Sequence, residues 1–275
     1  MAKSGKLHKI ASAIIISLWA ASQLLPQSGQ LSFLPRTVQA KEPSLPPHLI
    51  QSVTAEDFYR GMLAFDLADC PVLAEEDRES ACETVRDSVV RIEMGNVYGS
   101  GVIFRLTEDG VVIATNRHVL DYWREDVGVI RFAQGFSVGA QALGSAQDCD
   151  VGFLKVEGSE LGAETLLTLR SVPVDEEVCR LLTAGEEAFC LGADREAGEL
   201  MYQEAVVAET ERYIDIFGGE MLYLHGFAKE GMSGGGIFDG YGHLIGLLAG
   251  GTWRNEVAGV PAKQVLQAYR EIVGE

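Results

Sequence analysis

A glycine-rich segment at residues 231–236 constrains the fold of this chain most strongly. The segment reads Gly-Met-Ser-Gly-Gly-Gly and runs into an apolar stretch at 236–238, a turn at 239–242 and a second apolar stretch at 243–248. Two β-rich runs around an Asp-Gly turn are typical of a β-hairpin. Ser233 is therefore expected on a loop that a rigid strand pair holds in place.

Two further motifs stand in the same kind of context. Residues 101–106 and 111–115 flank an Asp-Gly turn and predict another hairpin, so His118 lies just past the end of a strand. Asp150 directly precedes the strand-like run Val-Gly-Phe-Leu-Lys-Val. The residue types of a hydrolytic triad thus occur in the order His, Asp, Ser, which differs from the order in subtilisin-like enzymes and in α/β-hydrolases.

Taken together, these motifs resemble those of bacterial trypsin-like (chymotrypsin-fold) serine peptidases. The chain is similar to the HtrA protease domain and, more distantly, to glutamyl endopeptidases. The resemblance spans residues 86–270 and implies an all-β fold: two six-stranded antiparallel β-barrels, a C-terminal helix and a short helical N-terminal extension. The matching stretches are 88–92, 99–103, Thr-Asn-x-His-Val around His118, Asp-x-x-x-Leu-Lys-Val from Asp150, 231–236, 244–246 and 259–261.

Carried onto matching positions, the resemblance implies a role for each triad residue. His118 is the general base, Asp150 orients its imidazole, and Ser233 is the nucleophile of an acyl-enzyme mechanism. The N–H groups of Gly231 and Ser233 form the oxyanion hole. Asp148 is the rival acid, but it lacks the Leu-Lys-Val register that follows Asp150.

Specificity is less sharply defined by the sequence. The resemblance assigns the substrate pocket to Phe227, Ala228, Leu248, Ala249, Gly250 and Gly251. Residues 249–251 offer a strand edge on which a substrate can pair by β-augmentation. Leu248 stands where glutamyl endopeptidases carry a histidine, so we expect a small or apolar pocket floor lined by Phe227, Ala228 and Leu248.

At several positions the sequence differs from related peptidases, and these differences bear on activation, disulfides and additional domains. Met232 replaces the aspartate that receives a new N-terminal ammonium in digestive trypsins, so activation by that ion pair is not expected. Val119 and Gly236 also differ from the animal enzymes, whose disulfide framework is therefore not transferred. The stretch after Pro261 is too short for the PDZ domain of HtrA proteins, and we expect none.

The N-terminal region predicts an exported protein. Residues 1–40 carry lysines at 3, 6 and 9 before an apolar run from 10 to 25, and this pattern indicates a signal peptide with an uncleaved membrane anchor as the alternative. Residues 41–85 read as a Pro-rich linker and a helical extension, with Thr54 capping one helix and a second helix at about 74–84. Residues 86–275 form one peptidase domain, and a periplasmic or secreted location follows.

Charge narrows the choice of partners. The formal net charge of −18 becomes −22 on removal of residues 1–40, which hold four basic and no acidic residues. An acidic field disfavours nucleic acid and, once the leader is cleaved, stable membrane association. The expected partner is a polypeptide substrate, while the oligomeric state is left open.

The chain has five cysteines in a compartment expected to be oxidising. Local disulfides between Cys70 and Cys82 and between Cys179 and Cys190 are the economical assignment, with Cys149 left as a small buried residue. No Cys-x-x-Cys or His-rich spacing indicates a metal site, and no cofactor is expected.

Two functions are compatible with these motifs. The first is a serine endopeptidase, an enzyme that hydrolyses peptide bonds with the triad above. The alternative is a catalytically weak or inactive peptide-binding module on the same fold. None of the three triad positions is substituted, and the sequence therefore favours the enzyme.

Overall fold

The computed structural model describes residues 53–196 and 198–274. The expected signal peptide at 1–40 and the linker up to residue 52 lie outside these described residues, and both stay predictions. Within the described ranges, no helix combines the length and the apolar character that crossing a membrane requires.

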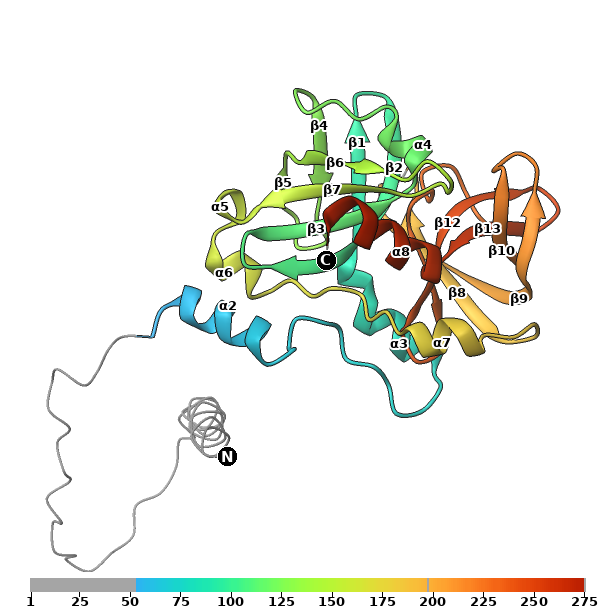
Figure 1. The fold of residues 1–275 in the computed structure, drawn as a ribbon, viewed down its shortest axis with the longest axis horizontal. Helices are drawn as coiled ribbons and strands as arrows, with labels where there is room; N and C mark the ends of the chain where they lie inside the picture. The colour runs from blue at the N-terminus through green and yellow to red at the C-terminus, as the bar shows by residue number, and fades with distance from the viewer. Residues whose placement is uncertain (1–52, 197, 275) are drawn as a thin grey trace, which may run out of the picture. The chain divides into compact units, whose positions relative to one another are not determined.

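The first half of the peptidase region is an antiparallel sheet of seven strands in the order β5-β4-β1-β2-β3-β7-β6 (Figure 1). Its strands are β1 (Val89–Met94), β2 (Val97–Thr107), β3 (Gly110–Thr115), β4 (Gly128–Arg131), β5 (Ser137–Val138), β6 (Gln141–Ser145) and β7 (Gly152–Glu157). The expected six-stranded barrel differs here in strand count and closure. The two-residue β5 is added because the Phe132 N–H donates to the Phe136 carbonyl at 3.0 Å and their rings stack, closing a tight β4–β5 turn.

The second half is a closed six-stranded barrel, as expected, in the order β10-β13-β12-β11-β8-β9. Its strands are β8 (Glu187–Ala193), β9 (Leu200–Ile214), β10 (Gly219–Gly226), β11 (Gly236–Asp239), β12 (Leu244–Thr252) and β13 (Glu256–Pro261). Both predicted hairpins are confirmed, since β2 pairs with β3 and β11 pairs with β12. The chain therefore has the predicted trypsin-like, mostly β fold.

Helix α8 (Ala262–Val273) packs against both halves, on β6 of the first and on β12 and β13 of the second (Figure 1). Its Tyr269 ring lies 5.2 Å from the ring of Phe104 and 5.6 Å from that of Phe153, measured between centroids. Full burial of such side chains stabilises the folded state by roughly 1.5–3 kcal/mol each. The predicted C-terminal helix is thus confirmed. It packs on both halves, and the aromatic cluster anchors it to the first half.

The predicted helical extension is present, with one shifted boundary. Helix α2 (Ala55–Ala64) begins after Thr54, whose side chain and that of Asp57 form a reciprocal capping box. Helix α3 (Arg78–Val85) begins later than expected, because the Asp77 carboxylate accepts the N–H groups of residues 79 and 80 and so caps it there. The remaining helices are η2 (Arg86–Ser88), α4 (Arg117–Leu120), α5 (Gly158–Leu161), α6 (Ala163–Leu166) and α7 (Glu176–Leu181).

All five cysteines are free thiols in the structure, so the two expected disulfides are not formed. Cys70 lies 3.1 Å from the Ser88 hydroxyl, measured from Sγ to Oγ, instead of pairing with Cys82. Cys190 is fully buried among core residues of the closed barrel, and burial raises the pKa of its thiol to about 12. Sequence proximity was a poor guide here: Cys70 and Cys82 pack in the same cluster without pairing, and Cys179 is not part of the cluster that buries Cys190.

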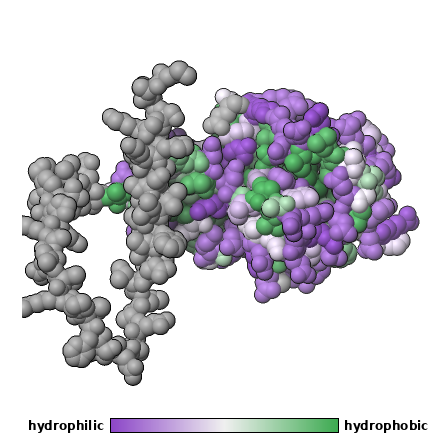
Figure 2. Space-filling view, turned by 90° about the horizontal axis from the view of Figure 1, so that it is seen from below, coloured by the Kyte–Doolittle hydropathy of each residue, from purple (hydrophilic) through white to green (hydrophobic). Residues whose placement is uncertain are grey.

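The surface is mainly hydrophilic on the face that Figure 2 shows, with apolar residues gathered between the polar ones. This agrees with the strongly acidic composition of the chain. Several large apolar side chains are nevertheless exposed near the β9–β10 and β12–β13 turns, among them Tyr213, Ile216 and Trp253.

The turn between β11 and β12 is closed by an Asp239–His243 pair. One carboxylate oxygen of Asp239 accepts the N–H groups of Tyr241 and His243, and the other lies 2.9 Å from His243 Nδ1. The hydrogen bond with Asp239 raises the pKa of His243 above its ordinary value, while burial acts in the opposite direction.

We expect His243→Gln to destabilise the fold more at about pH 5.5 than at about pH 8.5. A histidine whose pKa is raised on folding stabilises the folded state fully below its unfolded pKa of about 6.5, and this contribution is lost as pH rises through the folded pKa. Thermal unfolding across this range measures the effect. A Tm difference that does not change with pH would contradict it.

Candidate active site

His118 lies in α4, directly after β3, and two contacts with one carboxylate fix it. Its backbone N–H donates to Asp150 Oδ1 at 3.0 Å, and its Nδ1 lies 2.7 Å from Asp150 Oδ2. The Asp150 side chain is 6% exposed, while the histidine side chain is 44% exposed. The imidazole is therefore anchored on its Nδ1 side and open to solvent elsewhere, which is the arrangement a general base requires.

Asp150 is held in turn by the residues before His118. The Asn116 side-chain amide donates to the Asp150 carbonyl at 3.0 Å. Arg117 Nη1 donates to the carbonyls of Ala146 and Gln147, in the loop that leads to Asp150. The motif around His118 thus fixes both the histidine and the backbone of its acidic partner.

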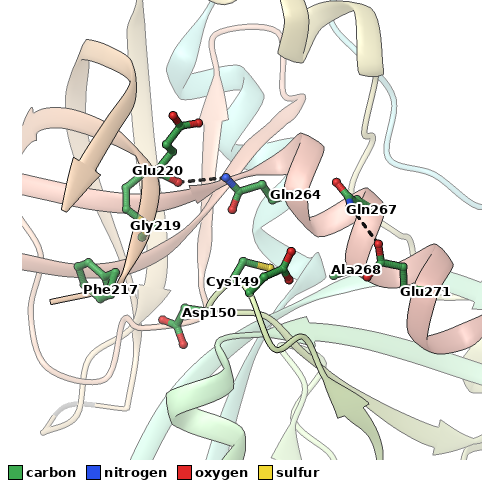
Figure 3. Close-up of a pocket in the computed structure, with 11 residues that line it drawn as sticks. Cys149, Asp150, Phe217, Gly219, Glu220, Gln264, Gln267, Ala268 and Glu271 are labelled. Carbon is green, nitrogen blue, oxygen red and sulfur yellow. Dashed lines mark hydrogen bonds between the residues drawn. The ribbon is translucent and has the colours of Figure 1, made fainter. Parts of the chain in front are cut away.

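The rival acid Asp148 is exposed and has no contact with His118 among the described residues. It belongs instead to the wall of a cavity of about 190 Å³ beside Asp150 (Figure 3). Gln264 and Glu271 of α8 contribute to the same wall. Cys149 also lines it, and burial raises the pKa of this thiol to about 11, so it is not activated as a nucleophile.

Ser233 lies in the turn between β10 and β11, against the end of the first half. Its carbonyl accepts the N–H of Ser100 on β2 at 2.7 Å. The following Gly234 has a φ of +86°, and a Cβ there would lie 2.1 Å from the Ser100 carbonyl oxygen. Only glycine fits at this close approach of two backbones.

The Ser233 hydroxyl donates to the carbonyl of Ala249 at 3.3 Å. Within the part of the chain that the structure describes, it makes no hydrogen bond with His118. The segments that carry His118 and Ser233 nevertheless both lie close to Gly99, where the two halves meet. A Cβ on Gly99 would lie 2.6 Å from Val119, the neighbour of His118, and 3.5 Å from the Ser233 carbonyl oxygen.

The expected oxyanion-hole donors are free to bind a ligand. Across the described ranges, the N–H groups of Gly231 and Ser233 donate to no protein acceptor. Gly231 has a φ of +96°, and a Cβ there would lie 2.7 Å from both Ala193 O and Arg195 N. Two backbone N–H groups without internal partners at one turn can stabilise a negative charge.

The residues expected at the substrate pocket surround the same turn. Leu248 is fully buried in the core of the closed barrel, and Ala228 packs partly buried against that core. Gly250 and Gly251 pair with β13 on one side, after a register shift at Ala249. Phe227 is 38% exposed at the start of the loop. The prediction that these residues line a pocket stays open, but the structure brings them together.

The comparisons with known proteins identify the family. Residues 99–247, more than half of the chain, match the trypsin-like peptidase domain model. The chain belongs to the trypsin-like peptidase family. No curated protein sequence matches the chain significantly.

Solved structures give the same fold for this trypsin-like peptidase. A serine-to-alanine variant of the HtrA-type protease AlgW, in a structure with a tripeptide, is similar to it at TM-score 0.62 and 18% identity, over 72% of this chain and 64% of that one. A structure of AlgW with a decapeptide gives a TM-score of 0.62 at 16% identity, covering 72% and 67%. The inactive form of Rv3671c from M. tuberculosis H37Rv gives 0.57 at 18% identity, covering 74% and 97%. The chain thus spans only about two thirds of AlgW, and likeness at these identities concerns the fold.

Sequence reasoning missed three residues that hold this site: Ser100, Asn116 and Arg117. All three stand in stretches that carried the resemblance, at 99–103 and around His118. Their polar side chains at the ends of apolar strands were the available signal. Their partners are backbone carbonyls and amides of distant loops, which no sequence pattern specifies.

The two acids near His118 can be separated by substitution. Asp150→Asn should lower turnover by roughly 10⁴-fold, because an amide imposes the wrong histidine tautomer. Asp148→Asn should change turnover less than about twofold, because that carboxylate is exposed and has no contact with the imidazole. Steady-state hydrolysis of one peptide substrate by both variants measures this. A large loss with Asp148→Asn would exclude Asp150 as the sole acidic partner.

Proposed function

We propose that this peptidase is a serine endopeptidase that cleaves polypeptides through an acyl-enzyme formed on Ser233. The observation that carries the proposal is the buried Asp150 carboxylate, which binds both the N–H and Nδ1 of His118. Such a carboxylate fixes the tautomer with a free Nε2 and stabilises the imidazolium that forms during catalysis.

In the proposed reaction, His118 Nε2 takes the Ser233 hydroxyl proton as the oxygen attacks the scissile carbonyl. The tetrahedral oxyanion accepts hydrogen bonds from the N–H groups of Gly231 and Ser233, each worth about 3–4 kcal/mol. The imidazolium then protonates the leaving amine, and the C–N bond breaks to give the acyl-enzyme. Water, deprotonated by His118, hydrolyses the ester and restores the serine.

The alternative of a peptide-binding module has one observation in its favour. The Ser233 hydroxyl donates to the Ala249 carbonyl, so it must rotate away from that bond before it can donate to His118. Catalytic hydrogen bonds are often long or misaligned in ligand-free enzymes, and this rotation is inexpensive for a loop serine. A fluorophosphonate probe decides between the two, since only an activated Ser233 reacts covalently.

Substitution of the nucleophile provides the central test. We expect Ser233→Ala to abolish probe labelling and to lower peptide hydrolysis by about 10⁴–10⁶-fold. Its Tm should stay within a few degrees of the wild type, because the side chain makes one weak hydrogen bond. Full activity in the variant would refute the assignment, and a folded wild type that resists the probe would favour the binding module.

The close approach of the segments around Ala228 and Gly251 indicates a narrow pocket for the residue before the scissile bond. A Cβ on Gly251 would lie only 2.9 Å from the Ala228 Cβ, so the two walls approach each other closely. Leu248, behind them, is fully buried and apolar. Small, uncharged side chains at the residue before the scissile bond fit this space best.

Peptides with Ala, Ser or Val before the scissile bond should therefore be cleaved about 10-fold or more faster than those with Phe or Arg. One methylene in an apolar pocket is worth roughly 1–3 kcal/mol of discrimination. Ala228→Gly should relax this preference, whereas Gly251→Ala should sharpen it and slow all substrates. A peptide-library cleavage profile measures the pattern, and a preference for bulky residues in the wild type would overturn it.

We further propose that the enzyme acts outside the cytoplasm on polypeptides. The support is the basic and apolar N-terminal sequence at 1–40, together with structures of a similar fold that were determined with peptides. Cell fractionation and N-terminal sequencing test it, with a mature start at residue 41 expected.

A further inference from the structure

The oxyanion-hole turn lacks the acid that anchors it in digestive trypsins, since Met232 occupies that position. Met232 is fully buried, and its backbone lies directly over Gly192 of β8, where a Cβ would be 2.7 Å from the Met232 Cα. The Met232 side chain fills the space, and its sulfur accepts the Lys229 N–H at 3.4 Å but, among the described residues, no group of the Glu230–Gly231 peptide. Other groups must therefore set the orientation of the Gly231 N–H.

The hydroxyl of Ser100 is placed to do this. It donates to the Gly231 carbonyl at 2.7 Å and accepts the N–H of Ala193, at the end of β8, at 2.8 Å. Ser100 is fully buried, so water cannot replace either bond. One side chain from the first half thus links the catalytic turn to the start of the β8–β9 loop.

The backbone of Ser100 acts on the same turn. Its N–H donates to the Ser233 carbonyl at 2.7 Å, and its own carbonyl accepts the Thr115 hydroxyl, also at 2.7 Å. Thr115 ends the strand that leads to His118. The position of the Ser100 hydroxyl is thereby fixed relative to both the base and the nucleophile.

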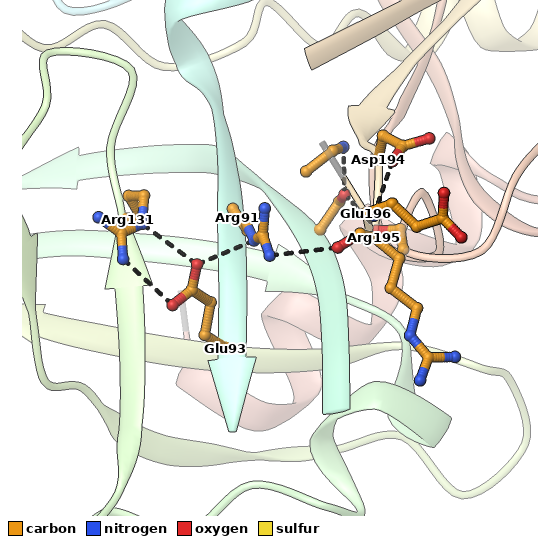
Figure 4. Close-up of polar contacts among 9 residues, drawn as sticks. Arg91, Glu93, Arg131, Asp194, Arg195 and Glu196 are labelled. Atoms are coloured by element: carbon orange, nitrogen blue, oxygen red, sulfur yellow. Dashed lines mark hydrogen bonds and ion pairs between the residues drawn. The ribbon is translucent and has the colours of Figure 1, made fainter. Parts of the chain in front are cut away.

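The β8–β9 loop holds the preceding peptide plane. The Arg195 N–H donates to the Glu230 carbonyl at 3.0 Å, which turns the N–H of the Glu230–Gly231 peptide to the opposite side. Figure 4 shows this loop beside Arg91, whose Nη2 lies 3.5 Å from the Arg195 carbonyl. The Ser100 bond to Ala193 fixes the residue where the loop begins.

We propose that Ser100 is a positioning residue that holds the Gly231 N–H in the orientation required for the oxyanion hole. The inference rests on the proposed peptidase function. Without the hydroxyl, the Gly231 carbonyl and the Ala193 N–H lose their shared partner. The peptide after Gly231 then keeps only the Met232 N–H bond to the Lys229 carbonyl, at 3.2 Å, and the loop whose Arg195 N–H holds the preceding peptide loses its anchor at Ala193. Ser100 need not touch the substrate to have this effect.

The test compares Ser100→Ala with Ser88→Ala, which removes another fully buried hydroxyl. Ser88 contacts Cys70 and makes no bond to the catalytic turn. We expect Ser100→Ala to lower kcat by about 10–100-fold with KM within about twofold, since misplacement by about 1 Å can cost 10²-fold. Ser88→Ala should retain kcat at a similar loss of Tm. An unchanged kcat in folded Ser100→Ala would overturn the proposal.

Two readouts separate positioning from a merely structural role. A peptide aldehyde forms a tetrahedral adduct that needs the oxyanion hole, so its inhibition should weaken by the same factor as kcat. The affinity of an uncleaved peptide, measured in a Ser233→Ala background, should not change on adding Ser100→Ala, and the pH profile of kcat/KM should keep its shape. An equal loss of peptide affinity would contradict the proposal. If Ser100→Ala does not fold, Ser100→Cys, whose thiol is a weak hydrogen-bonding group, replaces it with the same expected order of effects.

If the protein is not a peptidase, the experiments give a result that differs from failure of the Ser100 proposal. In that case the wild type neither hydrolyses peptides nor reacts with the phosphonate probe. Amide hydrogen exchange still tests the contact itself: the segments 190–196 and 227–235 should exchange faster in Ser100→Ala and not in Ser88→Ala. Unchanged exchange in these segments would refute the role of Ser100 whether or not the protein is an enzyme.

Discussion

The active site depends on the contact between strand β2 and the catalytic turn, because its residues come from two separately packed β units. His118 and Asp150 belong to the first unit and Ser233 to the second. The backbone N–H and the hydroxyl of Ser100 donate to carbonyls of the turn, and the glycine at 234 allows the Ser100 carbonyl to lie close against it. Helix α8 also joins the two units, since it packs on β6 of the first and on β12 and β13 of the second and is anchored to the first by Tyr269. A shift of one unit against the other would separate the proposed base from the proposed nucleophile.

Asp150 is buried, and within the described residues no lysine or arginine side chain forms an ion pair with it. An isolated buried carboxylate is costly unless hydrogen bonds compensate it. Here the compensating donors are the backbone N–H and the imidazole of His118, so the same contacts that stabilise the charge also orient the base. The exposed Asp148 has no such constraint. The two carboxylates are chemically alike, and their different positions relative to strand β7 decide that Asp150 and not Asp148 contacts His118.

Much of this fold follows from sequence, since hairpins with Asp-Gly turns and alternating apolar runs specify local pairing. The capping box at Thr54 and the amphipathic closing helix were predictable for the same reason. Strand count in the first sheet was not, because β5 exists through one turn hydrogen bond and a ring stack between Phe132 and Phe136. The predicted cysteine pairing was also wrong, since tertiary packing directs each thiol, as where Cys70 contacts Ser88 and Cys190 is buried in the barrel core. Contacts such as Ser100 with Gly231 join residues over a hundred positions apart, and local patterns carry no information on them.

Because Met232 cannot form an ion pair beneath the turn, contacts between distant residues such as Ser100 and Gly231 orient it. An ion pair beneath the turn would orient it with a single strong interaction that appears only after activation. Here several neutral hydrogen bonds do so, and all are present in the unprocessed chain. The ion pair between Lys229 and Asp194, at 3.4 Å, adds little, because the lysine is half exposed and solvent screens it. Orientation by buried neutral groups is nearly independent of pH and salt. We therefore expect the geometry of the proposed oxyanion hole to depend on the folding of the two halves and not on a processing event at the N-terminus.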